Sequence, residues 1–112
     1  MSLPHAVPGQ VIAIHPLGEK LKSAVSTALV KTPHLEVMRL VLPAGKAIEE
    51  HQLSGEVTLQ CLEGELEVQT DGAIRVLHEA EMLVLAAGQP YALRAQADAS
   101  VLATMLLHQP AN

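Results

Sequence analysis

Histidine, cysteine and tyrosine are the side chains in this sequence that could carry acid–base, nucleophilic or metal chemistry. The chain has six histidines, one cysteine and one tyrosine. No two histidines stand at the i, i+2 or i, i+4 spacing that would put two imidazole ligands on one strand or helix face. Five of them fall near the termini, at a turn or among polar residues, and we expect these to be solvated: His5, His15, His34, His78 and His108. His51 remains as the candidate for chemistry.

Cys61 and the acidic residues give weaker signals. A lone cysteine cannot form an intrachain disulfide, and Cys61 alternates with Val57 and Leu59, so we expect it to face inward as a small hydrophobic side chain. Adjacent residues of an extended chain point to opposite sides, so Glu49 and Glu50 are predicted to be solvated rather than to form a catalytic acid pair. Three alternating glutamates are predicted to form the wet face of a hairpin: Glu63, Glu65 and Glu67.

Composition excludes several classes of function. The 112 residues suffice for one domain with one core, and a net charge of −5 has the wrong sign for binding nucleic acid or anionic lipid. Without Trp or Phe the core has to be aliphatic, and we expect Met38, Met82 and Met105 to help fill it. We find neither a secretory signal pattern nor an apolar run near the roughly 18 residues of a membrane span, so we expect a cytoplasmic protein.

The N-terminal third gives mixed patterns. Residues 11–14 (VIAI) are predicted to form a short strand that Pro16 and Gly18 end. The spacing of apolar residues over 19–31 predicts a helical turn that leads into a strand. Residues 32–34 are predicted to turn, because Pro33 restricts the residue before it and cannot donate to a strand ladder.

From Leu35 onward the period is two, which predicts a succession of strands that ends with residues 101–107. Glu63-Gly64 and Asp71-Gly72 are predicted hairpin turns. Short strands with a turn signal about every eight to twelve residues indicate an all-β sandwich or barrel. Because we find no linker or repeat, residues 1–112 are predicted to form a single domain.

One segment carries a family resemblance. Residues 43–64 read PAGKAIEEHQLSGEVTLQCLEG, which resembles the first cupin motif, with Gly45, His51 and Gly64 in register. Residues 86–93, AAGQPYAL, resemble the second motif, with Gly88 kept and Tyr91 where a histidine belongs. The resemblance covers about residues 35–107 and leaves residues 1–34 as an N-terminal extension. It implies the cupin-type double-stranded β-helix, the jelly-roll barrel of small RmlC-like proteins.

The departures from the motifs concern the metal site. Cupins that hold a metal use two histidines and a glutamate of the first motif and a histidine of the second. Here Leu53, Val57 and Tyr91 stand at three of these four places, and His51 alone is kept. Two aliphatic side chains cannot donate a lone pair, so we predict no metal and no other cofactor. Glu56 adjoins one of these places, but strand alternation should point it away from the interior.

The residues at these places predict a binding site rather than a catalytic one. We expect a small, largely apolar molecule to lie in the barrel against Leu53, Val57 and the inward-facing Cys61, oriented by His51 and Tyr91. His51 has a second interpretation, as a histidine bonded only to Tyr91 or to a buried water, and the Tyr91 ring could simply fill space.

Two alternatives stay open. One is an enzyme of the dioxygenase, isomerase or decarboxylase type that the family includes, with His51 and Tyr91 as an acid–base pair. The other is a structural dimer that has neither ligand nor activity. A homodimer is expected in any case, because a mean hydropathy of +0.27 leaves more apolar side chain than one small barrel can bury, and edge strands need cover.

Overall fold

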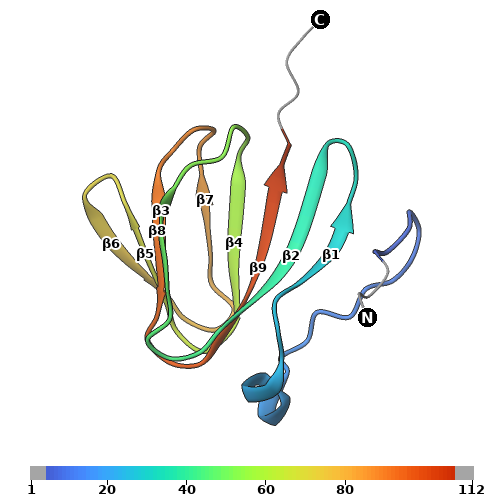
Figure 1. Cartoon of the computed structure of the whole chain (residues 1–112), viewed down its shortest axis with the longest axis horizontal. Helices are drawn as coiled ribbons and strands as arrows, with labels where there is room; N and C mark the ends of the chain where they lie inside the picture. Colours follow the sequence, from blue (N-terminus) through green and yellow to red (C-terminus); the bar gives the residue numbers. More distant parts are fainter. Residues whose placement is uncertain (1–4, 108–112) are drawn as a thin grey trace, which may run out of the picture.

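Two antiparallel β-sheets face each other in the computed structural model, which describes residues 5–107 (Figure 1). The five-stranded sheet has the order β1-β2-β9-β4-β7 and the four-stranded sheet the order β3-β8-β5-β6. No helix within these residues is long and apolar enough to cross a membrane. The elements are η1 (Gly18–Ser23, a 3-10 helix), β1 (Thr27–Lys31), β2 (Leu35–Leu42), β3 (Ala47–His51), β4 (Val57–Glu63), β5 (Leu66–Thr70), β6 (Ala73–Leu77), β7 (Met82–Leu85), β8 (Tyr91–Ala95) and β9 (Ala99–Leu106).

This arrangement confirms the predicted all-β jelly-roll class, and most of the strands with it. The helical turn followed by a strand over residues 19–31 is present as η1 and β1. The Asp71-Gly72 turn joins β5 to β6, and both residues have positive φ, 52° and 72°. That is the type I′ geometry whose twist matches a two-residue hairpin, which explains why this sequence signal was reliable.

The core lies between the inner faces of the two sheets and is aliphatic apart from one ring. On β4 the alternating Val57, Leu59 and Cys61 are all fully buried, as predicted. They pack against inward-facing side chains of both sheets in one cluster, whose other buried members are Leu42, Leu66, Val68, Leu77, Leu85, Tyr91, Leu93, Ala95, Ala99, Val101 and Ala103. The period of two therefore decides which residues meet between the sheets.

The prediction of a Glu63-Gly64 hairpin is wrong. β4 belongs to the five-stranded sheet and β5 to the four-stranded one, so the chain crosses between sheets here instead of turning back beside itself. Gly64 has a φ of 84°, and a Cβ at this position would overlap the backbone of Asp98 and Ala99. A glycine before a change of direction marks a sharp bend, and the sequence does not say whether the next strand stays in the same sheet.

The predicted wet face of three glutamates is wrong at Glu63. Its carboxylate accepts hydrogen bonds from the backbone N–H groups of Leu17 (2.8 Å) and Gly18 (3.0 Å) and from Ser100 Oγ (2.6 Å). Ser100 is fully buried, so the carboxylate ties the start of η1 to the five-stranded sheet. Glu65 and Glu67 are half-buried and make surface contacts, Glu65 with His78 at 3.0 Å and Glu67 with Gln96 at 3.1 Å.

The predicted strand at residues 11–14 is also wrong. These residues pair with no strand, and Val11 is 92% exposed. The buried side chain of Arg39 donates instead to the carbonyl oxygen of Ala13 (3.4 Å) and to that of the following His15 (2.9 Å). A short apolar segment forms a strand only where a neighbouring strand can pair with its backbone. Here the Arg39 guanidinium, not a strand, bonds the backbone of this segment.

The predicted environment of single side chains is mostly confirmed. His5, His15, His34 and His78 are exposed, and so are Glu49 and Glu50, while His108 lies outside the described residues. Met105 packs against the core and Met38 is half-buried. The prediction that Met82 fills the core is wrong, because Met82 lies on the outer face of the five-stranded sheet and is 58% exposed.

The Glu63 clamp predicts a pH-dependent stability. Desolvation raises the pKa of Glu63, but the hydrogen bonds from Ser100, Leu17 and Gly18 and the charge of Arg39 outweigh it, and the pKa lies below the usual value of 4.5. A carboxyl group with a lowered pKa in the folded state stabilises that state above its unfolded pKa, and this contribution is lost as the pH falls through the folded value.

We therefore expect Glu63→Gln to lower the free energy of unfolding by about 1–3 kcal/mol near neutral pH, because charge-assisted hydrogen bonds are lost. The difference from the wild type should shrink below pH 4.5, the pKa of a free glutamate. Urea unfolding from pH 7 to pH 3 measures both effects. Glu50→Gln is the control, since Glu50 makes no side-chain bond to the described residues. A difference that stays constant with pH would contradict the clamp.

Candidate functional site

His51 and Tyr91 lie side by side at one end of the sandwich, where the segments 52–56 and 86–90 connect the sheets (Figure 1). We call this end the mouth. His51 ends β3, Tyr91 begins β8, and the two residues are register partners. Their ring centroids are 4.4 Å apart, with the ring planes tilted by 51°. The two residues that the motif resemblance singles out are therefore in contact.

A bulge in β3 gives His51 its direction. Ile48 pairs with Leu93 and His51 with Tyr91, so three residues of β3 advance against two of β8. Ile48 packs against the core, and strict alternation would turn a residue three places further on to the outside. The extra residue of the bulge restores His51 to the inner side, next to the Tyr91 ring.

The pair offers one hydrogen-bond acceptor and one donor. Nδ1 of His51 lies 3.1 Å from the carbonyl oxygen of Glu49, which only accepts, so Nδ1 carries the proton and Nε2 of the neutral ring has a free lone pair. Desolvation raises the pKa of the Tyr91 phenol, so the phenol stays protonated at neutral pH. Tyr91 makes no hydrogen bond within residues 5–107, and every fully buried side-chain oxygen there has a partner. The phenol oxygen must then reach solvent at the mouth.

The three remaining predicted ligand residues differ in burial. Val57 and Cys61 are buried members of the core cluster, and Leu53 is half-buried against it. The Cys61 thiol donates to the carbonyl oxygens of Glu63 (3.4 Å) and Gly64 (3.6 Å), and desolvation raises its pKa. A protonated, buried thiol is a packing group rather than a nucleophile. Val57 and Cys61 therefore lie within the packed core, whereas Leu53 is only half-buried.

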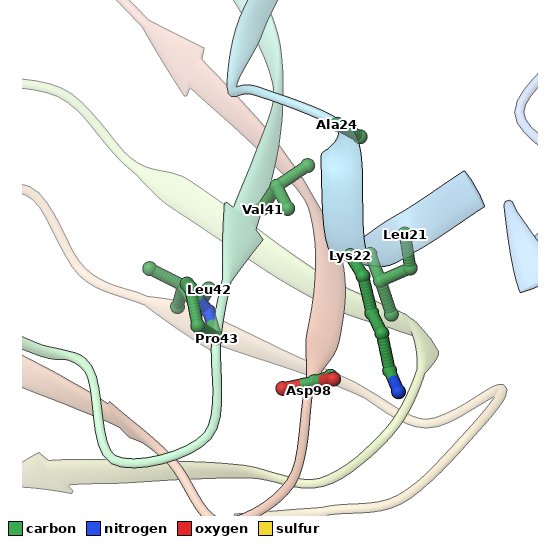
Figure 2. Close-up of a pocket in the computed structure, with 7 residues that line it drawn as sticks. All are labelled: Leu21, Lys22, Ala24, Val41, Leu42, Pro43 and Asp98. Atoms are coloured by element: carbon green, nitrogen blue, oxygen red, sulfur yellow. The ribbon is translucent and has the colours of Figure 1, made fainter. Parts of the chain in front are cut away.

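The surface has two hollows that the sequence did not point to. Figure 2 shows the first, of about 180 Å³, which is lined by Leu21 and Ala24, before β1, and by Val41 and Leu42 of β2. Its walls are mainly aliphatic, and the Asp98 carboxylate at its edge accepts from the Ala44 N–H (2.8 Å), a structural contact. It offers no group for chemistry beyond the rim.

The second hollow, of about 320 Å³, lies at the mouth end of the sandwich, and its lining has polar groups from two segments: His34 of the β1–β2 turn, and Ser54 and Glu56 of residues 52–56. No hydrogen bond joins the side chains of these three residues. Glu56 is exposed while Val57 is buried, which confirms that Glu56 points away from the interior. Composition alone would suggest a serine–histidine–glutamate relay here, and the lack of contact between the side chains argues against one.

Comparison with known proteins bears on the fold. No protein-family model matches the chain, and a comparison with curated proteins gives no match. Among solved structures, a conserved protein of unknown function from Streptococcus pyogenes is similar over 98% of this chain and 97% of its own, with 21% identity and a TM-score of 0.75. An RmlC-like cupin from Desulfovibrio desulfuricans is similar over 86% of this chain and 97% of its own, with 25% identity and a TM-score of 0.71. The chain folds as a small cupin domain.

The cupin fold also occurs in enzymes much longer than this chain. A variant of salicylate 1,2-dioxygenase from Pseudoaminobacter salicylatoxidans matches 71% of this chain but only 25% of its own length, with 21% identity and a TM-score of 0.67. Neighbours with this fold thus include enzymes and proteins of unknown function. The fold by itself does not select between these possibilities.

The side chains at the cupin metal positions do not fit a divalent ion. The positions that the motif resemblance assigns to the metal carry one imidazole, two aliphatic side chains and one phenol, at His51, Leu53, Val57 and Tyr91. Residues 5–107 contain no cluster of three or more His, Cys, Asp or Glu side chains that could hold a metal. Three or four nitrogen, oxygen or thiolate donors are needed for tight binding. That the purified protein carries no stoichiometric metal stays a prediction, which elemental analysis tests.

The cupin register makes a second prediction. We expect Leu53→His together with Val57→Glu to create a metal site with His51, because cupins that hold metal have His, His and Glu at these positions. Each new polar group in the apolar wall should destabilise the metal-free protein by about 1–3 kcal/mol. Zn²⁺, Mn²⁺ or Fe²⁺ should then raise the melting temperature of the double variant and leave the parent unchanged.

The control for this experiment is Leu53→Asn with Val57→Gln, which adds polarity without adding strong ligands. Thermal unfolding with metal and with chelator compares the three proteins. A folded double variant that ignores every metal would show that positions 51, 53 and 57 do not share one wall. A parent that responds as strongly as the double variant would contradict the predicted loss of the metal site.

Proposed function

We propose that this cupin domain binds a small, largely apolar molecule at its mouth without the help of a metal ion. The contact between His51 and Tyr91 is the observation that carries the proposal. Two polar side chains at the edge of an otherwise aliphatic interior are the arrangement expected of an orienting contact in a small-molecule site.

The chemistry of the pair suggests the polar part of the ligand. Tyr91 donates one hydrogen bond and Nε2 of His51 accepts one, so a group that both accepts and donates suits them: a hydroxyl, a primary amide or a protonated carboxylic acid. The apolar part of the ligand would lie against Leu53. Because Val57 and Cys61 are packed into the core, the ligand stays shallow unless Leu53 moves aside.

Binding is favoured over catalysis by the state of the same two groups. The raised pKa of Tyr91 makes the phenol a donor and a poor base, and His51 is then the only base of the pair. The imidazole is oriented by a neutral backbone carbonyl, not by a carboxylate that would stabilise its charged form. An enzyme that uses His51 and Tyr91 remains the alternative, and it would show itself as turnover of a bound probe.

Thermal unfolding with three probes that differ only in their polar group tests the proposal: 1-octanol, octanamide and octanoic acid. We expect at least one of them to raise the melting temperature saturably. Tyr91→Phe keeps the ring and removes one donor, so it should weaken that binding by about 3- to 10-fold. His51→Ala should weaken it as much or more.

The matched control is His15→Ala, which changes an exposed histidine of the N-terminal segment and should bind the probe as the wild type does. Equal stabilisation of the wild type, Tyr91→Phe and His51→Ala would place the probe elsewhere and overturn the proposal. No stabilisation by any of the probes would favour the structural-dimer alternative. Product formation that His51→Ala abolishes would favour the enzyme.

A further inference from the structure

The first hollow, between η1 and the end of β2, lies at the end of the sandwich opposite the mouth (Figure 1). We call it the η1 hollow. Its volume is about 180 Å³, and Leu21, Val41 and Leu42 contribute aliphatic side chains to its walls. An apolar cavity of about 150 Å³ holds a molecule of the size of benzene, so a short aliphatic group fits here. Most small-molecule sites are larger, which limits the ligand of this hollow to a very small molecule.

The segment that forms one wall of the η1 hollow is fixed on both sides of η1. Before it, the Glu63 carboxylate holds the backbone where η1 begins. After it, the Ser26 hydroxyl oxygen accepts a hydrogen bond from the N–H of Val41 (2.8 Å). Leu21 is buried between these two points, and Ala24 carries only a methyl group, which leaves the hollow open. The η1 hollow is therefore formed before any ligand arrives, as most ligand sites are.

Two opposite charges line the same hollow, on Lys22 and Asp98. Figure 2 shows the ammonium end of Lys22 and the Asp98 carboxylate at one end of the hollow, on the side away from Ala24. Within residues 5–107, the Lys22 ammonium group makes no hydrogen bond and no ion pair. Oδ1 of Asp98 accepts from the Ala44 N–H, and Oδ2 has no partner among the same residues. Each group is therefore able to bind an opposite charge of a ligand.

We propose that the η1 hollow binds a free α-amino acid with a small aliphatic side chain, such as leucine or valine. The carboxylate of the amino acid pairs with Lys22, its ammonium group pairs with Oδ2 of Asp98, and its side chain packs against Leu21 and Leu42. A simple carboxylate would be attracted by Lys22 but repelled by Asp98, and a simple amine would meet the reverse problem. An α-amino acid carries both charges at one end and its apolar group at the other, as the hollow requires.

Titration of the full chain with L-leucine, followed by proton–nitrogen correlation spectra, tests the proposal. We expect saturable shifts of the backbone amides of η1 and of residues 41–44, with a dissociation constant on the order of 1 mM for so small a ligand. Glycine lacks the aliphatic side chain and should bind at least about tenfold more weakly. Leucinamide lacks the carboxylate and N-acetyl-leucine lacks the ammonium group, and each should bind about 3- to 10-fold more weakly than leucine.

Three variants assign the contacts. Lys22→Gln should weaken leucine binding about 3- to 10-fold and leave leucinamide binding unchanged, because leucinamide has no carboxylate to pair. Asp98→Asn keeps an oxygen for the Ala44 N–H, and it should weaken the binding of leucine but not that of N-acetyl-leucine. Ala24→Leu fills the hollow and should abolish binding. Lys20→Gln is the matched control, since it removes the same charge from an exposed lysine of η1 that lies outside the lining of the hollow.

Several outcomes would overturn the proposal. These are the absence of leucine-dependent shifts at η1, equal binding of leucine and glycine, and equal binding of leucine by the wild type and Lys22→Gln. Tighter binding of octanoic acid than of leucine, measured on the amides of η1, would show that the hollow takes an aliphatic anion instead. The two charged residues that are changed lie at the rim, so the test does not depend on the folding of Ala24→Leu. Because the η1 hollow and the mouth are at opposite ends of the sandwich, none of these results depends on the ligand proposed for the mouth.

Discussion

Aliphatic packing between the inner faces of two sheets is the constraint on which the rest of this molecule depends. With no Phe or Trp, and with Tyr91 as the one ring, the space between the sheets is filled by Leu, Val and Ala side chains. Aliphatic groups gain stability only by close contact, so voids between them are unfavourable. Val57 and Leu59 therefore fill the interior, and the His51–Tyr91 pair lies at the mouth.

On the outer surface of the five-stranded sheet, by contrast, charged side chains hold the N-terminal segment in place. Arg39 and Glu63 lie on that surface, and both turn to backbone groups of residues 13–18. Each charge is thereby matched with several hydrogen bonds, which is the condition for keeping it in a half-buried place. The N-terminal segment is fixed by these two side chains rather than by a strand ladder, and what it leaves uncovered is the apolar part of the face.

The sequence predicted those features that depend on neighbours along the chain. Alternation from Leu35 onward placed Cys61 and Val57 inside, and the positive φ that Asp71-Gly72 favours gave the β5–β6 hairpin. The predictions were wrong where residues distant in the sequence determine the local structure. Residues 11–14 have the composition of a strand but no strand beside them. Met82 alternates correctly, yet its outward direction follows from pairing with Gln60.

The site was predicted in part for the same reason. The motif spacing identified His51 and Tyr91 as neighbours, because glycine-bounded segments of fixed length leave little freedom of register. The bulge between Ile48 and His51, which turns the imidazole inward, has no signature in the residues themselves. The clamp by Glu63 was missed because a glutamate in an alternating run looks solvated until Ser100 and the start of η1 are placed beside it.

Size and composition together explain why few polar groups lie inside this domain while apolar side chains remain on its surface. A domain of 112 residues buries about two-thirds of the surface of its unfolded chain, and aliphatic side chains each bury less area than the aromatic rings this chain lacks. The interior is therefore filled with aliphatic side chains that leave little room for polar groups. Hydrophobic residues make up 49% of the chain, and one small core does not hold all of them. Met82 and Val84 accordingly stay 58% and 63% exposed on the outer face of the five-stranded sheet.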